Sequence, residues 1–179
     1  MSEIATPSQT VGPFFQIGLD RISVNNLTTH LATAKRLTIS GRVLDGEGKP
    51  VIDALVELWQ ADADGRYSGH DAFKGYGRIP TDSRGAFSFT TIKPGRVLGP
   101  NAVLQAPHIA VNLFMRGLLK HLVTRIYFPG EPANLEDVVL NRIPVERRST
   151  LIAQIGNRPN ALLWDIVLQG NQETVFFDC

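Results

Sequence analysis

Short strand-like segments separated by turn-forming clusters constrain the fold of this chain more than any other feature. The first segment alternates apolar and polar side chains from Leu37 to Val43, and a cluster rich in glycine and acidic residues follows at 45–50. A period of two is typical of β-strands, and such clusters are typical of tight turns. Further strands are predicted at 54–60, 87–91, 108–114, 122–128 and 161–169, with a candidate at 174–177.

Helical periodicity is confined to one stretch of the sequence. Apolar residues recur at helical spacing in 145–155, at Leu151, Ile152 and Ile155, which predicts a short helix there. A succession of short strands without long helices between them favours two sheets packed face to face. We therefore expect an all-β, two-sheet β-sandwich over residues 36–179 with little helix.

Residues 1–35 differ from the rest and predict an extended N-terminal arm. The segment 6–15 carries two prolines and a glycine among polar residues, which is typical of an arm or loop and not of a helix. Phe14, Phe15 and Ile17 are nevertheless large apolar side chains that need a surface to cover them. The sequence leaves open whether this surface belongs to the chain's own domain or to a partner.

Composition restricts the class of protein. The chain has 179 residues, 43% of them hydrophobic, which suits one domain with a sizeable core. Its formal net charge of +1 provides no basic surface for nucleic acid. The single cysteine, Cys179, cannot form an internal disulfide. With neither a signal peptide nor an apolar run of about 18 residues, we expect a cytoplasmic protein without a membrane span.

The candidate chemical residues are few. Nucleotide and acyl-transfer chemistry are disfavoured, because the sequence has no Gly-rich phosphate loop and no serine nucleophile elbow. A pair of histidine ligands on one strand face requires positions i and i+2, but the residue two after His108 is Ala110. Tyr67 is more often a packing residue at such a turn. Arg116 is more often solvated, although its guanidinium also suits carboxylate recognition.

Several segments, in this order, resemble the intradiol aromatic-ring dioxygenases, and the resemblance runs nearly end to end. The segments are 6–13 (TPSQTVGP), 58–65 (LWQADADG), 91–95 (TIKPG), 106–109 (APHI), 125–128 (RIYF) and 173–178 (ETVFFD). The resemblance implies a two-subunit member of the family, in which a β subunit holds Fe(III) through two tyrosinates and two histidines. It also implies cleavage of 3,4-dihydroxybenzoate by O₂ to 3-carboxy-cis,cis-muconate, in the β-ketoadipate pathway of aromatic degradation.

The family's ligand positions are only half filled in this chain. The resemblance places the two tyrosines at Tyr67 and Val97, and the two histidines at His108 and Ala110. The family's active-site arginine corresponds to Gln105. We therefore expect that this chain holds no iron, that it corresponds to the α subunit, and that Tyr67 and His108 are vestigial ligands.

The resemblance further implies that the chain completes the active site of a homologous iron-bearing β subunit, in αβ units of a larger assembly. The residues it would lend to the substrate pocket are Thr10, Gly12 and Pro13 on the arm, together with Arg116. The guanidinium of Arg116 would stabilise the carboxylate of the substrate and select it over plain catechol. Phe14 and Phe15 would anchor the arm on the partner.

Two alternatives remain open at this point. One is a self-sufficient dioxygenase whose metal site uses His70, His121 or Tyr76 instead. The other is a ligand-binding β-sandwich module without any dioxygenase role, because one sandwich fold hosts many functions.

Overall fold

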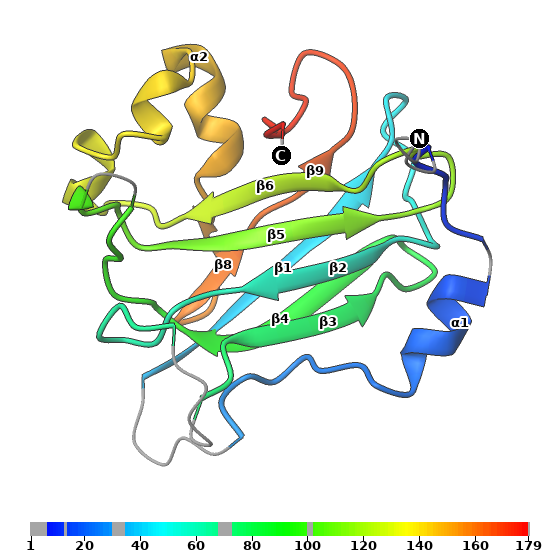
Figure 1. The fold of residues 1–179 in the computed structure, drawn as a ribbon, viewed down its shortest axis with the longest axis horizontal. Helices are drawn as coiled ribbons and strands as arrows, with labels where there is room; N and C mark the ends of the chain where they lie inside the picture. Colours follow the sequence, from blue (N-terminus) through cyan, green and yellow to red (C-terminus); the bar gives the residue numbers. More distant parts are fainter. Residues whose placement is uncertain (1–6, 13, 30–34, 68–72, 100–101, 179) are drawn as a thin grey trace, which may run out of the picture.

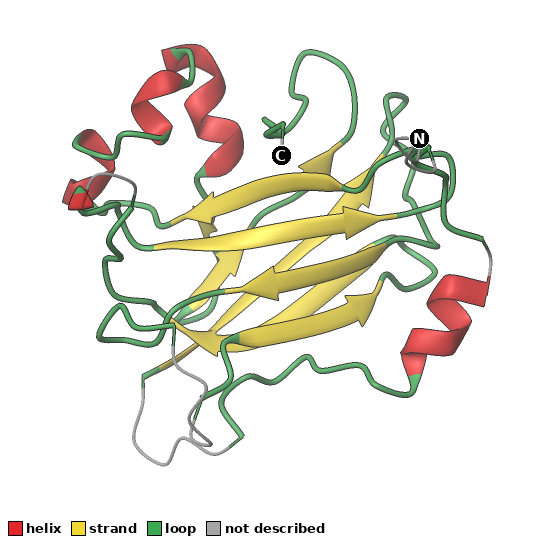
Figure 2. Ribbon diagram, in the orientation of Figure 1, coloured by secondary structure: helices red, strands yellow, loops and turns green. Residues whose placement is uncertain are grey.

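The computed structural model describes residues 7–12, 14–29, 35–67, 73–99 and 102–178. Two β-sheets lie face to face, and the helices lie at the margins of the sandwich (Figures 1 and 2). In Figure 1, α1 (Phe14–Asp20) lies beside β3, whereas α2 (Val145–Arg148) lies at the opposite end. Short 3₁₀ helices occur at η2 (Pro132–Leu135), η3 (Leu140–Arg142) and η4 (Ser149–Leu151). Among the described helices, none is long and apolar enough to cross a bilayer.

One sheet is fully antiparallel and has four strands in the order β3-β2-β5-β6. These strands are β2 (Leu55–Trp59), β3 (Tyr76–Pro80), β5 (His108–Phe114) and β6 (Leu122–Tyr127). Its register pairs Ala110 of β5 with Trp59 on one side and with Arg125 on the other.

The second sheet is built around one long strand, β1 (Arg36–Leu44), which pairs antiparallel with β4 (Ala86–Ile92). Along its other edge β1 pairs in parallel with β8 (Ala161–Leu163) and then with β9 (Ile166–Val167). The strand β7 (Gln154–Ile155) completes this sheet beside β8.

The main core lies between the two sheets and follows from the alternation along each strand. In β5 the side chains of Ile109, Val111 and Leu113 are fully buried in this core, together with Ile39 and Phe89 of the second sheet. The intervening residues of β5 therefore point to the opposite, outer face of the four-stranded sheet.

The sandwich and most of its strands confirm the sequence-based expectation. The segment 161–169 is not one strand, however, because β8 and β9 are separated at Trp164, whose backbone N–H donates to the carbonyl of Ser40 at 2.9 Å. The strands β3 and β7 were not predicted. The candidate strand at 174–177 is wrong, since its only ladder contact is a single bridge between Val123 and Phe177.

The helical expectations need two corrections. The helix predicted over 145–155 is confined to α2 and η4, and Ile155 instead lies in β7 with 77% of its surface exposed. The arm, expected to lack helix, forms α1 directly after its proline-containing part. The backbone N–H of Phe15 donates to the carbonyl of Gly12, and the Phe15 ring packs 5.5 Å from that of Phe114. Tertiary contact thus stabilises a helix that the local composition disfavours.

Candidate functional site

The outer face of the four-stranded sheet carries a polar cluster at the start of β5. His108 and Ala110 both lie on this face, because they are two residues apart on one strand. Arg125 is the β6 neighbour of Ala110, and Trp59 is its β2 neighbour. The structure therefore brings the two vestigial ligand positions His108 and Tyr67 to one place, since Tyr67 stacks on Trp59 with ring centroids 6.0 Å apart.

A chain of hydrogen bonds fixes this cluster. Arg125 Nη1 donates to Gln105 Oε1 at 2.6 Å and lies 3.5 Å from the phenolic oxygen of Tyr127. The Tyr127 hydroxyl donates in turn to Asp137 Oδ1 at 3.0 Å. Asp137 is fully buried, and its other oxygen accepts from the backbone N–H of Ala106 at 2.7 Å. The buried carboxylate is thus satisfied, and it holds the segment that leads into β5 in place.

His108 is a neutral histidine in this setting. Its side chain is buried, and its Nδ1 lies 2.8 Å from the carbonyl of Ala106, which assigns the proton to Nδ1. Burial lowers the pKa of His108, and the nearby positive charge of Arg125 lowers it further, against smaller opposing effects of Ala106 and Asp137. The ring consequently presents an unprotonated Nε2 at neutral pH.

Tyr67 remains protonated as well. Burial raises the pKa of its phenol, and the charge of Arg125 only partly offsets this effect. About half of the side chain, 49%, is exposed. A tyrosinate ligand would have to lose this proton.

The donor set at this place does not fit a ferric ion of the family's kind. Val97 and Ala110 stand where the resemblance expects a tyrosine and a histidine, and neither side chain has a donor atom. Within the described ranges, no group of three or more His, Cys, Asp or Glu residues could hold a metal ion.

The alternative ligands do not complete this site. The Tyr76 hydroxyl donates to Glu57 Oε1 at 2.9 Å, and burial together with this carboxylate raises the pKa of Tyr76 to about 12. His121 stacks on Phe114 at 5.2 Å, at the far end of β5. Phe114 lies six positions after His108 along the strand, which corresponds to about 20 Å. His70 lies outside the described residues.

The second group of predicted site residues lies at this far end of β5. Arg116 follows the strand by two residues, and its Nε donates to Asp53 Oδ2. In the same turn, the backbone N–H of Gly117 donates to Thr10 Oγ1 at 2.8 Å. The structure therefore brings the arm residue Thr10 to the Arg116 turn, although the two are more than 100 positions apart in the chain. Gly12 is exposed nearby on the arm, and Pro13 lies outside the described residues.

The arm divides its apolar residues between the chain's own domain and the outside. Phe15 packs on Phe114, whereas 80% of Phe14 and 66% of Ile17 are exposed. A cavity of about 950 Å³ opens next to the Arg116 turn, between the arm, the segment 118–121 and the C-terminal segment 176–178. The side chains left exposed are available to a partner surface.

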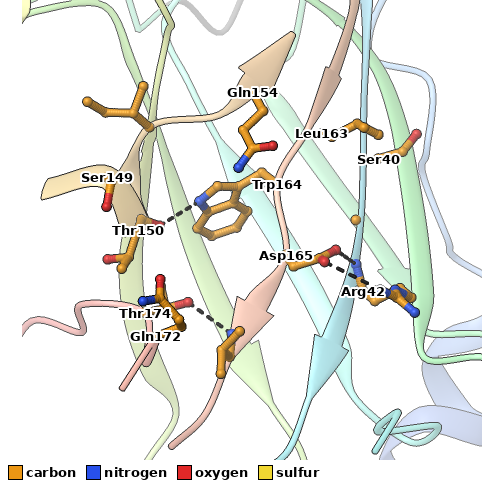
Figure 3. A pocket seen from close by; sticks show the side chains of 13 residues that line it. Ser40, Arg42, Ser149, Thr150, Gln154, Leu163, Trp164, Asp165, Gln172 and Thr174 are labelled. Atoms are coloured by element: carbon orange, nitrogen blue, oxygen red, sulfur yellow. Dashed lines mark hydrogen bonds and ion pairs between the residues drawn. The ribbon is translucent and has the colours of Figure 1, made fainter. Parts of the chain in front are cut away.

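A cavity of about 620 Å³ on the second sheet is a weaker candidate for a functional site (Figure 3). Three of its polar side chains already bond within the fold. The Thr150 hydroxyl donates to the Arg147 carbonyl at 2.8 Å, and Thr174 Oγ1 accepts from the Val167 N–H at 3.0 Å. The Trp164 indole donates to the Thr150 carbonyl at 2.9 Å. These hydroxyl and indole groups therefore serve structural roles.

Asp53, the partner of Arg116, was not singled out from the sequence. It lies in the bend before β2 and has no motif around it. Once β2 and β5 are aligned, the register that pairs Leu55 with Phe114 continues to Asp53 opposite Arg116. The pairing of the two strands would have been the signal, and it is not local in the sequence.

Comparison with known proteins identifies the family of this chain. A family model described as "Dioxygenase" matches residues 12–170. The chain is 39% identical over 194 aligned positions to the protocatechuate 3,4-dioxygenase alpha chain of Burkholderia cepacia, covering 97% of this chain and 96% of that one. It is 41% identical to the alpha chain of Pseudomonas putida, with the same coverage of both chains. It is also 40% identical to the beta chain of Burkholderia cepacia, over 78% of this chain and 67% of that one.

Structural similarity extends over the whole sandwich. The dioxygenase domain of a dioxygenase–carbohydrate-binding protein fusion from Streptomyces superposes with a TM-score of 0.66 at 30% identity, covering 96% of this chain and 100% of that one. Hydroxyquinol 1,2-dioxygenase from Pseudomonas putida superposes with a TM-score of 0.67 at 22% identity, covering 93% of this chain and 67% of that one. This similarity supports the shared fold. With the family model matched over most of its length, this chain belongs to the intradiol ring-cleavage dioxygenases.

Proposed function

We propose that this chain is the iron-free α subunit of a protocatechuate 3,4-dioxygenase and acts with a homologous, iron-bearing β subunit. The complex would catalyse the O₂-dependent intradiol cleavage of 3,4-dihydroxybenzoate to 3-carboxy-cis,cis-muconate, in the β-ketoadipate pathway of aromatic degradation. The observation that carries the proposal is similarity to two alpha chains over 97% of this chain, combined with Val97 and Ala110 at two of the four ligand positions.

The similarity to a named beta chain supports the partnership. This chain is 40% identical to the beta chain of Burkholderia cepacia, which is what two subunits of common origin would give. The ferric ion of the partner would supply the activation of the catecholate toward O₂. In this proposal the arm, residues 1–35, contacts the partner, and its exposed Phe14 and Ile17 become buried there. Assembly of several αβ units is part of the same proposal.

The contribution of this chain to catalysis would be to bind and orient the substrate. The Arg116 side chain is 61% exposed and carries a permanent positive charge, so its guanidinium can donate two parallel hydrogen bonds to the substrate carboxylate. Thr10 and Gly12 would line the pocket from the arm, with Pro13 beside them. These residues hold no metal and transfer no proton; they fix the position of the ring.

The proposal is tested by purifying this chain alone and together with a β subunit. We expect the lone chain to lack stoichiometric iron and ring-cleaving activity, and the complex to have both. The measurements are metal analysis, the visible absorption of a tyrosinate–iron centre, and O₂ consumption with 3,4-dihydroxybenzoate. A colored, iron-loaded and active lone chain would contradict the proposal and would favour the self-sufficient alternative.

Replacing Arg116 tests the substrate role separately. In the complex, Arg116→Ala should raise KM for 3,4-dihydroxybenzoate by the equivalent of roughly 1–2 kcal/mol, a value reduced for the partial exposure of the pair. Iron content should not change. Arg116→Lys keeps the positive charge but lacks the forked guanidinium. Its KM should lie between those of the wild-type complex and Arg116→Ala. Loss of iron in Arg116→Ala would show that this residue is structural.

A further inference from the structure

We propose that Asp53 is a positioning residue that orients the Arg116 guanidinium toward the carboxylate of the aromatic acid. This inference rests on the proposed function, and it assigns to Asp53 the task of selecting acidic over neutral substrates. Asp53 does not contact the substrate in this proposal; it acts through Arg116.

The strand register places the two residues opposite each other. Leu55 pairs with Phe114, and Val56 with Leu113, in the antiparallel ladder of β2 and β5. Two residues beyond the last pair, this register sets Asp53 against Arg116, where side chains of opposite charge meet across two antiparallel segments. The register of β2 and β5 thus sets the Asp53 carboxylate opposite Arg116, just beyond the ends of both strands.

The two members of the pair differ in exposure. The Asp53 side chain is 23% exposed, whereas that of Arg116 is 61% exposed. The carboxylate therefore lies against the protein and the guanidinium extends from it. Without such a partner, a long, exposed arginine samples many rotamers. Ordering it on ligand binding costs conformational entropy and so lowers the affinity for the ligand.

The geometry of the guanidinium leaves one edge for a ligand. Arg116 Nε donates to Asp53, and across the described part of the chain the Arg116 side chain makes no other hydrogen bond. The edge formed by Nη1 and Nη2 remains, and it can donate two parallel hydrogen bonds to a carboxylate. A second constraint acts on the same turn, because Gly117 N–H donates to Thr10 Oγ1. The turn and the side chain are thus held separately.

The effect of Asp53 should therefore be seen in binding and not in folding, since ion pairs with an exposed partner contribute little to stability. We would compare the αβ complex carrying Asp53→Asn with the wild-type complex. The variant is isosteric and removes the charge. We expect KM for 3,4-dihydroxybenzoate to rise about three- to tenfold with kcat and iron content unchanged. Inhibition by the neutral analogue 3,4-dihydroxybenzamide should not change.

Two variants serve as controls. Asp53→Glu retains the carboxylate and should restore part of the lost affinity. Asp165→Asn removes a carboxylate that pairs with Arg42, an arginine of the second sheet whose side chain is 55% exposed, and it should leave KM unchanged. Equal loss of affinity for the acid and the amide, or a lower melting temperature with no change in KM, would overturn the inference.

A double-mutant cycle separates this inference from the proposed function. If Asp53 acts through Arg116, adding Asp53→Asn to Arg116→Ala should have no further effect on KM. Additive effects would overturn the inference. If Arg116→Ala lowers the affinity for the acid but Asp53→Asn does not, the positioning role fails while the role of Arg116 stands. If Arg116→Ala itself leaves the preference for the acid intact, the proposed substrate role fails, and with it this inference.

Discussion

At the scale of single residues, one charge decides the chemistry of the polar cluster. Arg125 lies between Gln105 and the rings of Tyr67, His108 and Tyr127, and its positive charge acts on all three rings. It lowers the pKa of His108 in the same direction as burial does. Burial is the larger cause of the lowered pKa, and the charge of Arg125 adds to it, so the histidine is neutral at neutral pH.

The depressed pKa of His108 predicts how stability depends on pH. In the unfolded chain His108 has an ordinary pKa of about 6.5, whereas in the folded protein its pKa is lower. Between these two values the unfolded state binds more protons. The free energy of unfolding should therefore decrease as pH falls below about 6.5, and it should be unaffected by this group above that pH.

Urea unfolding at pH 7.5 and pH 5.5 measures this effect against His108→Gln, which cannot titrate. The wild-type protein should lose more stability between the two pH values than the variant does. The same loss in both proteins would mean that His108 is not responsible.

At the scale of elements, β5 organises both groups of residues. Its alternation sends Ile109, Val111 and Leu113 into the core and His108 and Ala110 to the outer face. The cluster of Arg125 lies at its beginning and the Arg116 turn just beyond its end. The strand thus separates the polar cluster from the turn at which we propose that Arg116 binds the substrate carboxylate.

The contact between the arm and this turn gives a second prediction. Thr10→Val removes the hydroxyl that accepts from Gly117 N–H while keeping the shape of the side chain. Because both groups are exposed, water can replace the bond and stability should change by less than about 0.5 kcal/mol. In the complex, KM for 3,4-dihydroxybenzoate should rise about two- to fivefold, since the arm loses its attachment to the turn.

Thr10→Ser is the matched variant, because it retains the oxygen that accepts this hydrogen bond. In steady-state kinetics, the KM of the Thr10→Ser complex should be close to that of wild type, and the KM of the Thr10→Val complex should be higher. An equal rise in KM for the two variants would show that the methyl group, and not the hydrogen bond, matters.

At the scale of the whole molecule, β1 holds the second sheet together, because β4, β8 and β9 all pair with it. The backbone at Trp164 lies against Gly41 of β1, where an added Cβ would be 1.8 Å from the carbonyl oxygen of Trp164. No side chain fits there unless the backbone of one segment moves. The connection between β8 and β9 therefore depends on a glycine in the middle of β1.

Gly41→Ala should consequently destabilise the protein by about 3 kcal/mol or more, because the backbone clash cannot be relieved by a rotamer change. Gly18→Ala, in α1, is the control, since nothing lies within 4 Å of its added Cβ. That variant should be neutral or slightly more stable. Thermal or urea unfolding measures both, and a Gly41→Ala protein within about 0.5 kcal/mol of wild type would contradict this role for Gly41.

Local patterns predicted a large part of this architecture. Alternation identified 108–114 with the bounds that β5 has, and it identified most of β1, β2, β4 and β6. Spacing along one strand also showed that His108 has Ala110 as its neighbour on the same face. These features are local, because side-chain direction in a strand repeats every two residues whatever the surroundings are. The helix α1 was not predictable in this way, since the packing of Phe15 on Phe114 stabilises it.

The sequence by itself thus determined most of the strands, the alternation of their faces and the absence of donor atoms at Val97 and Ala110. Only the tertiary structure decided that Arg125 lies among Tyr67, His108 and Tyr127, that Thr10 meets the Arg116 turn, and that Asp53 faces Arg116. Each of these contacts joins residues of different strands or segments. Their proximity follows from strand pairing and sheet packing, which depend on the whole chain and leave no mark in the residues nearby.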